Sequence, residues 1–173
     1  MSVDSLTLER AIDVENVRID VENVRIDDTS DGMDGDPHPD GLEYVLTLLR
    51  ESELPVDDVR SRPDAFHVAF HGSDPVGVGG VEVYGRHGLL RSVAVEREVR
   101  GEGLGTALCD ALERRAADAG VETLYLLTTT AAEFFAGRGY LETERSAVPP
   151  AIQRTTEFRE LCPDSATCMR KTI

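Results

Sequence analysis

The spacing of apolar positions divides the chain after residue 39 into helices and strands. Apolar side chains recur at helical spacing over 42–49, which predicts a helix that starts at an Asp40 cap and ends before Pro55. A second, short helix is expected over 56–62. The pattern then alternates in AFHVAFHG and PVGVGGVEVYG, which predicts a hairpin with its turn at 72–75. A further turn at 87–88 and a strand over 89–95 complete a meander.

In the second half of the chain, segments with the helical spacing of apolar residues alternate with segments typical of strands. A helix with an apolar face is expected up to Gly120, followed by the buried strand TLYLLTT over 123–129. The segment AAEFFAGRG reads as a helix that ends at Gly139, and strands are expected over 140–144 and 166–171. A meander followed by alternating helices and strands predicts an α+β fold with a mixed sheet.

Residues 1–38 differ in composition from the rest of the chain. They contain the heptad VENVRID twice, over 14–20 and 21–27, followed by the run DDTSDGMDGDPHPD. This run has too little apolar surface to order itself, and it lacks the terminal glutamate of a calcium loop. We therefore expect an acidic, disordered tail over 1–38 and one folded domain over 39–173.

The charge balance narrows the choice of partners. With 33 acidic and 18 basic residues the chain carries a formal charge of −15, so a nucleic-acid partner is not expected. Lysine occurs once, at 171, while acidic residues are spread along the chain. This profile is typical of halophilic proteins, although an acidic protein from a GC-rich genome would look the same. Without a signal-like start or a long apolar run, we expect a cytoplasmic protein with no membrane partner.

The candidate chemistry lies in the loop from Arg100 to Gly105, RGEGLG, which follows a buried strand and opens a helix. The first amides of a helix lack intrahelical partners and carry partial positive charge, and glycines let a phosphate approach them. Arg100 adds a charged fork. The alternative is a glycine-rich loop that merely turns a strand into a helix. We favour a pyrophosphate site, because three alternating glycines are entropically costly in a simple turn.

The type of phosphate ligand follows from the surroundings of this loop. In a dinucleotide fold the glycines follow the strand directly, and a carboxylate ends the next strand. Here residues 96–99 separate strand and loop, and the next strand ends in three threonines. A mononucleotide P-loop is excluded, because no Lys-Ser/Thr pair follows the glycines.

The motif Arg100-x-x-Gly103-x-Gly105, between a strand and a helix, resembles the acetyl-CoA signature of the GCN5-related N-acetyltransferases (GNAT). The resemblance extends over about residues 40–173 and includes TLYLLTT and AAEFFAGRGY. The strings LLRSVAV, YLLTTTAAEFFAGRGY and AVPPAIQRTTEFRELCP also resemble acetyltransferases that are often encoded with arsenic-resistance genes. The family's fold would be a mixed, mostly antiparallel central sheet flanked by helices.

The resemblance implies acetyl-CoA as co-substrate and a small-molecule amine as acceptor, with direct attack in a ternary complex. A non-catalytic acyl-CoA-binding or metalloid-responsive module is the alternative. Pairing of two chains through the C-terminal strands, as the family analogy allows, would give a homodimer. Pantetheine would pair with the backbone of residues 93–95, where the Val93 amide would polarise the thioester. The expected cofactor-binding residues are Val93, Val95, Arg100, Gly101, Glu102, Gly103, Leu104, Gly105, Thr106 and Phe135.

The residues that perform the transfer are harder to identify. Phe135 stands where many members carry a tyrosine acid, and Leu90 stands where phosphinothricin-type relatives carry a glutamate. Glu82 is the candidate base, unless simple alternation turns it to solvent. Ser92 or a nearby threonine would protonate the thiolate, unless water does so or the thiolate leaves unassisted.

Other polar residues have two readings each. Arg91 would anchor a substrate carboxylate or pair with a surface acid, and Thr128 and Thr129 would contact the acceptor or cap a strand end. We interpret Cys109, Cys162 and Cys168 as core or loop residues rather than metalloid ligands. His67 and His71 lie on one face of a strand and are interpreted as a surface pair, so no metal is expected.

Overall fold

A single mixed sheet of seven strands organises the computed structural model, which describes residues 6–11 and 41–173. The strand order is β1-β2-β3-β4-β5-β7-β6, and only the neighbours β4 and β5 are parallel. This arrangement confirms the predicted α+β fold with a mixed, mostly antiparallel sheet. The strands are β1 (Leu6–Arg10), β2 (Phe66–His71), β3 (Asp74–Tyr84), β4 (His87–Val95), β5 (Thr123–Thr128), β6 (Leu141–Glu142) and β7 (Thr167–Thr172).

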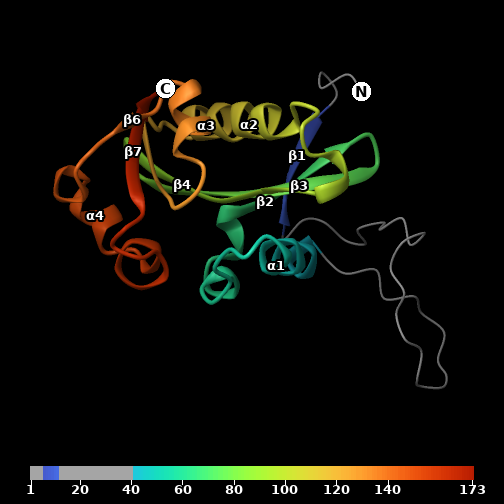
Figure 1. Cartoon of the computed structure of the whole chain (residues 1–173), viewed down its shortest axis with the longest axis horizontal. Helices are drawn as coiled ribbons and strands as arrows, with labels where there is room; N and C mark the ends of the chain where they lie inside the picture. The colour runs from blue at the N-terminus through green and yellow to red at the C-terminus, as the bar shows by residue number, and fades with distance from the viewer. Residues whose placement is uncertain (1–5, 12–40) are drawn as a thin grey trace.

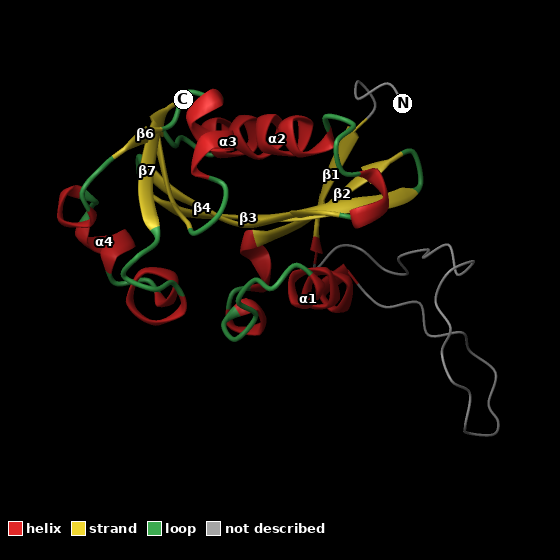
Figure 2. Cartoon of the chain, in the orientation of Figure 1, coloured by secondary structure: helices red, strands yellow, loops and turns green. Residues whose placement is uncertain are grey.

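Helices cover both faces of the sheet. On one face lie α2 (Leu104–Asp118) and α3 (Ala132–Gly137), and α1 (Gly41–Glu51) lies on the other (Figure 1). Short elements complete the α1 face, as Figure 2 shows: α4 (Pro150–Gln153) and a π-helical turn, η7 (Glu157–Leu161). Single 3₁₀ turns are found at η3 (Val59–Ser61), η4 (Pro63–Ala65), η5 (Arg97–Val99) and η6 (Arg145–Ala147).

Apolar side chains form three clusters around this sheet. The first joins α2 to the sheet through residues such as Leu108 and Leu112, and Cys109 lies in it as expected. Gly79 lets α2 approach β3, since a Cβ there would lie 2.4 Å from Leu112 Cδ1. The second cluster packs α1 against β2 and β3, and the third packs α4 and η7 against β4, β5 and β7.

The structure differs from the sequence expectation at the N-terminal end. The sequence predicts a disordered tail over residues 1–38, but Leu6–Arg10 forms the edge strand β1, antiparallel to β2. Leu6 and Leu8 pack partly buried against the α2-side core, while Thr7 between them is exposed. Five residues with two apolar positions are too short a pattern to recognise without the neighbouring strand. The duplicated heptad and the acidic run lie outside the described residues.

Two turns also differ from the expectation. Instead of a helix over 56–62 the chain forms the 3₁₀ turns η3 and η4, because Pro63 ends any helix before it gains enough turns. The turn between β3 and β4 lies at 85–86 rather than 87–88, and Gly85 takes its positive φ of 65°. Among the described residues, none of the helices combines the length and apolar character needed to cross a membrane.

Candidate active site

The sheet is split between its only parallel neighbours. β4 and β5 pair over His87–Leu89 and Thr123–Tyr125 alone. Beyond Leu89, β4 continues to pair with β3, while β5 pairs with β7 along its whole length. Within the described residues no strand pairs with the β5-facing edge of β4 from residue 90 onward, so that edge has backbone groups available to a ligand.

A bulge in β4 marks the split. Ser92 has a φ of 56°, which is unusual for a residue with a side chain, and the register between β3 and β4 shifts between Val78 and Gly80. A bulge bends its strand and re-aims the following side chains. The bulge therefore lies just beyond the point where β4 stops pairing with β5, while Ala94 and Val95 still pair with β3.

The predicted pyrophosphate loop lies beyond the far end of this split. Gly101 and Gly103 have φ values of 83° and 84°, and Gly103 is the N-cap of α2. The first helical hydrogen bond runs from the Ala107 amide to the Gly103 carbonyl over 3.1 Å. The amides of residues 104–106 therefore have no partner within the helix, and the helix dipole adds positive potential there.

A hollow of about 290 Å³, which we call the loop pocket, opens at this helix end. Leu104 is buried in the core, Glu102 is exposed and Val93 packs partly buried against the core, so these three expected residues do not line it. The residues that line the loop pocket are Val95, Arg100, Gly101, Gly103, Gly105, Thr106 and Phe134.

The two neighbouring phenylalanines of α3 have different surroundings. Phe135, which was expected at the cofactor, is 8% exposed and packs edge-on against Tyr140 in the core. Phe134 is 40% exposed and forms part of the loop pocket. Sequence reasoning missed Phe134, because the orientation of a six-residue helix cannot be read from its own pattern.

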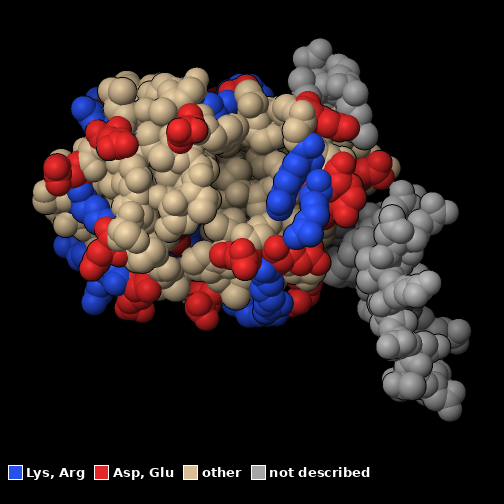
Figure 3. All heavy atoms as spheres, in the orientation of Figure 1, with Lys and Arg blue, Asp and Glu red and all other residues tan. Residues whose placement is uncertain are grey.

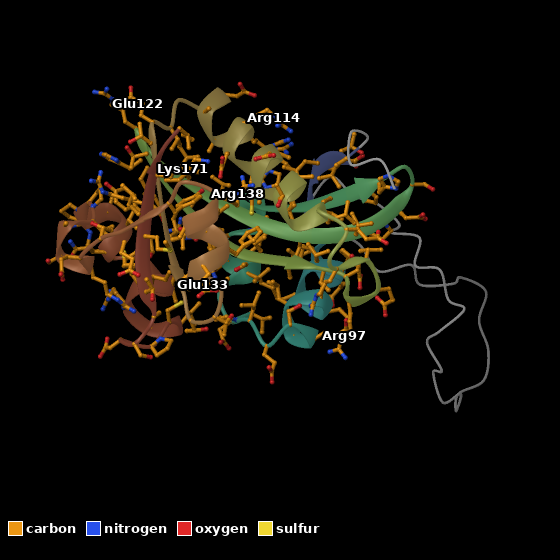
Figure 4. All side chains as sticks on the ribbon, turned by 45° about the horizontal axis from the view of Figure 1, so that its top comes forward. Arg97, Arg114, Glu122, Glu133, Arg138 and Lys171 are labelled. Carbon is orange, nitrogen blue, oxygen red and sulfur yellow. The ribbon has the colours of Figure 1, made fainter. Side chains whose placement is uncertain are left out.

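A second hollow of about 450 Å³, the rim pocket, lies between α1 and η5. Arg100 contributes to both pockets: its Nε donates to the Val95 carbonyl over 2.9 Å, and its Nη2 donates to Ser52 Oγ over 3.3 Å. In Figure 3, arginine and acidic side chains lie side by side at the border of a hollow, and Figure 4 places Arg97 next to α1. The rim pocket is lined by Leu48, Glu51, Glu96, Arg97, Glu98 and Arg100.

One carboxylate of the rim pocket is partly withdrawn from water. The Tyr44 hydroxyl donates to Glu96 over 2.6 Å. Burial, with the neighbouring Glu51 and Glu98, raises the pKa of Glu96, although the hydrogen bond from Tyr44 and the charge of Arg100 oppose this change. Glu96 therefore takes up a proton more readily than an exposed glutamate.

A second charged group is buried in the protein. It consists of Arg91 and three carboxylates, those of Asp58, Glu82 and Glu157, and we call it the Arg91 cluster. The guanidinium, whose side chain is 0% exposed, donates to both oxygens of Asp58 over 2.5 and 2.7 Å and to Glu82 over 3.0 Å. Its Nη2 lies 3.0 Å from Oε2 of Glu157. The cluster thus joins β3, β4, the segment after α1 and η7.

This cluster settles the position of two predicted site residues. Glu82 is 3% exposed, so the reading that it faces solvent by alternation is wrong. Arg91 is buried as well, so it does not pair with a surface acid; its partners are three buried carboxylates of this chain. Asp58 and Glu157 were not singled out in the sequence, because they come from irregular segments far away in the chain.

The hydroxyl-bearing candidates lie in different settings. Ser92 Oγ accepts a hydrogen bond from Arg91 Nε over 3.2 Å, so it touches the Arg91 cluster. Thr128 Oγ1 accepts from the Ala131 amide over 2.9 Å and caps the end of β5, while Thr129 is exposed. The structure thus shows a capping contact for Thr128.

The described cysteines and histidines lie in separate, mostly buried surroundings. All three cysteines are free, and burial is the main cause that raises the pKa of the Cys109 and Cys162 thiols to about 12. His67 was expected at the surface but is only 5% exposed, and burial lowers its pKa to about 4. In the part of the chain that the structure describes, no three His, Cys, Asp or Glu residues are grouped to hold a metal ion.

Comparison with known proteins agrees with this geometry. Residues 28–140 match the model of the acetyltransferase (GNAT) family, and the chain belongs to this family of acetyl-CoA-dependent acetyltransferases. A Bacillus subtilis (strain 168) protein, provisionally named an acetyltransferase, is 31% identical over 100 residues, which is 54% of this chain and 68% of that protein.

Solved structures share the fold at low sequence identity. A Mycobacterium tuberculosis protein in complex with CoA has a TM-score of 0.64 at 24% identity, covering 76% of this chain and 93% of its own. An acetyltransferase of Streptococcus agalactiae reaches 0.61 at 12% identity over 98% and 99%. N-acetylglutamate synthase of Neisseria gonorrhoeae, complexed with CoA and L-arginine, reaches 0.65 at 18% identity over 76% of this chain. This chain spans only 31% of that synthase.

Proposed function

We propose that this protein transfers the acetyl group of acetyl-CoA to an amine of a small molecule by direct attack in a ternary complex. The observation that carries the proposal is the unpaired edge of β4, with the free amides of the α2 N-terminus beyond its open end. A linear cofactor with a pyrophosphate at one end and a thioester at the other fits such a path. The pyrophosphate would bind the amides of residues 100–106, with Arg100 beside them.

The chemistry proposed for the thioester needs an oxyanion donor and two proton transfers. The amide of Val93 is the donor for the carbonyl oxygen as the tetrahedral intermediate forms. The amine nitrogen bonds to the acetyl carbon, the carbon–sulfur bond breaks, and CoA leaves as a thiolate. Ser92 supports proton delivery to that thiolate, because its Oγ accepts from Arg91 and keeps its own O–H available. The carboxylates of the Arg91 cluster, with Glu82 among them, are our candidates for taking the proton of the amine.

Calorimetric titration with CoA, followed by a thiol-release screen of amines, tests this proposal. The screen should contain primary amines and arsenic-containing amino acids, because of the resemblance to acetyltransferases of arsenic-resistance operons. Thiol release that depends on both an amine and the protein is the expected result. CoA binding without amine-dependent release on any acceptor would contradict the transfer reaction.

We also propose that the chain forms a homodimer through its C-terminal strands. β6 is an edge strand of the sheet, and its Leu141 is 65% exposed, a large apolar side chain at an unpaired edge. Light scattering should give twice the chain mass for the wild type and the monomer mass for Leu141→Glu. A monomeric wild-type protein at the concentrations used for the assay would rule out this arrangement.

A further inference from the structure

The Arg91 cluster lies at the inner end of the split between β4 and β5. Arg91 comes two residues after Leu89, the last residue of β4 that pairs with β5. Its guanidinium stacks over Phe66 at 5.4 Å, which belongs to the core on the α1 side. The cluster is therefore on the sheet face opposite α2, on the side that α1 covers.

Four of the five N–H bonds of Arg91 donate to groups of this chain, and the fifth faces Glu157. A guanidinium has five N–H bonds in a fixed fork. Nε donates to Ser92, and the two terminal nitrogens face Asp58, Glu82 and Glu157. A carboxylate of an acceptor would have to displace one of these partners and leave a buried negative charge unpaired, which is costly.

Negative charge exceeds positive charge at this place. Three carboxylates surround one buried guanidinium, and among the described residues Arg62, which is half-exposed, also pairs with them, at 3.6 Å from Glu82. Both oxygens of Glu82 have hydrogen-bond donors, because Arg91 donates to one and the Tyr84 hydroxyl to the other. Glu82 therefore has its main partners within the protein.

Within the Arg91 cluster, Glu157 has a carboxylate oxygen that accepts no hydrogen bond. Its Oε1 accepts from the Cys162 thiol over 3.2 Å. Its Oε2 is buried and, although 3.0 Å from Arg91 Nη2, makes no hydrogen bond. The residue is 5% exposed, and burial is the main cause that raises its pKa. A buried acceptor without a donor costs free energy, so a cationic donor from a ligand would be stabilising here.

We infer that the Arg91 cluster selects the acceptor by its ammonium group, which Glu157 contacts through Oε2, directly or through one water, and that it disfavours acceptors with a carboxylate beside the amine. This inference rests on the proposed function of the same site. Glu157 then takes the proton of the ammonium, and the freed lone pair attacks the acetyl carbon. Glu157 begins a π-helical turn, a rare backbone form that is often found at functional sites.

Matched pairs of ligands test the selectivity on the wild-type protein saturated with CoA. Propylamine and 2-aminobutyrate differ only by the carboxylate, and 2-aminobutyramide keeps the bulk without the charge; tyramine and tyrosine form a second pair. NMR titration should give dissociation constants at least tenfold lower for the amines than for the amino acids. The dissociation constant of 2-aminobutyramide should be close to that of propylamine. Equal or tighter binding of the amino acids, or no binding of any member, would overturn the inference.

The variant Glu157→Gln tests the residue itself. We expect at least tenfold weaker binding of propylamine or tyramine, with CoA affinity changed less than twofold. Glu160→Gln on the same turn, which is exposed, is the matched control and should change neither. Unchanged amine binding by a folded Glu157→Gln protein would refute the assignment, and if this variant does not fold, the ligand pairs still decide. Selective amine binding without thiol release would refute the proposed transfer and leave this inference standing.

Discussion

At the scale of single residues, the fold leaves room for a side chain at Gly105. An added Cβ at this position would lie 3.9 Å from both Phe134 Cζ and Val95 Cγ2, which is ordinary contact distance. The neighbouring Gly103 is different, since its φ of 84° would cost a side chain roughly 1–2 kcal/mol. Binding and folding can therefore be separated by substitution within one loop.

We predict that Gly105→Ala keeps its stability and binds CoA at least tenfold more weakly. The methyl group fits against the protein and replaces glycine inside a helix, but it occupies space in the loop pocket. Gly137→Ala is the control, because nothing lies within 4 Å of its added Cβ and the residue is not in the loop pocket. Calorimetry and thermal melting measure both effects. Unchanged CoA affinity in Gly105→Ala would contradict a pyrophosphate in this loop.

His67 makes stability depend on pH at the residue scale. Burial lowers its pKa to about 4 in the folded protein, whereas the unfolded chain has a value near 6.5. Below pH 6.5 the unfolded state binds the proton more readily than the folded state. The stability associated with neutral His67 is therefore complete above pH 6.5 and is lost as pH falls towards 4. The difference between the two pKa values corresponds to roughly 3 kcal/mol of unfolding free energy.

We therefore expect His67→Phe to show a flatter loss of stability between pH 6.5 and 4 than the wild type. Urea unfolding at several pH values measures this slope, with His71→Gln as the control on the same strand. His71 lies at the half-buried end of β2, whereas His67 lies in its buried part. Equal slopes for wild type and His67→Phe would show that other groups dominate the acid response.

At the scale of elements, Arg91 links four segments at the inner end of the split between β4 and β5. It binds Asp58 after α1, Glu82 on β3 and Glu157 on η7, while itself belonging to β4. No amphipathic pattern in η7 or in residues 56–62 would bring them to this place, because both segments are short and irregular. The ionic contacts of Arg91 therefore add to the apolar packing of Val59 and Phe158 in holding these segments over the sheet.

We predict that Arg91→Met destabilises the fold at neutral pH by about 3–5 kcal/mol, because three buried carboxylates lose their counter-charge. Part of this loss should be recovered at pH 5, because burial raises the pKa of Glu157 and this carboxylate can then take up a proton. Denaturant unfolding at pH 7 and pH 5 gives both values. Arg60→Met, at an exposed ion pair with Glu43, is the control and should cost less than 1 kcal/mol. A loss below 1 kcal/mol for Arg91→Met would mean that the cluster is not buried as described.

At the scale of the whole molecule, the net charge of −15 produces self-repulsion that salt screens. If the acidic composition reflects a halophilic origin, the melting temperature should rise as KCl increases from low to molar concentrations. Sucrose, which favours compact states without screening charge, is the control. A melting temperature that does not respond to KCl would contradict the halophilic interpretation.

Local patterns in the sequence predict much of this fold. The periodicity of residues 42–49 and 104–118, the alternation in the hairpin and the glycine loop after a buried strand each depend on neighbours in the chain. For that reason the mixed sheet, the α1 and α2 helices and the loop pocket at Gly101–Gly105 could be predicted from the sequence. β1 could not, since two leucines in five residues become a strand only beside β2.

What the tertiary structure alone decided is the environment of the polar residues. The sequence by itself determined that a glycine-rich loop opens a helix, because that signal is contained in six consecutive residues. It did not determine that Glu82 is buried, that Phe134 rather than Phe135 lines the loop pocket, or that Arg91 is engaged by three carboxylates. Burial and charge pairing depend on segments far apart in the chain, such as η7, and these meet only when the sheet and its helices have packed.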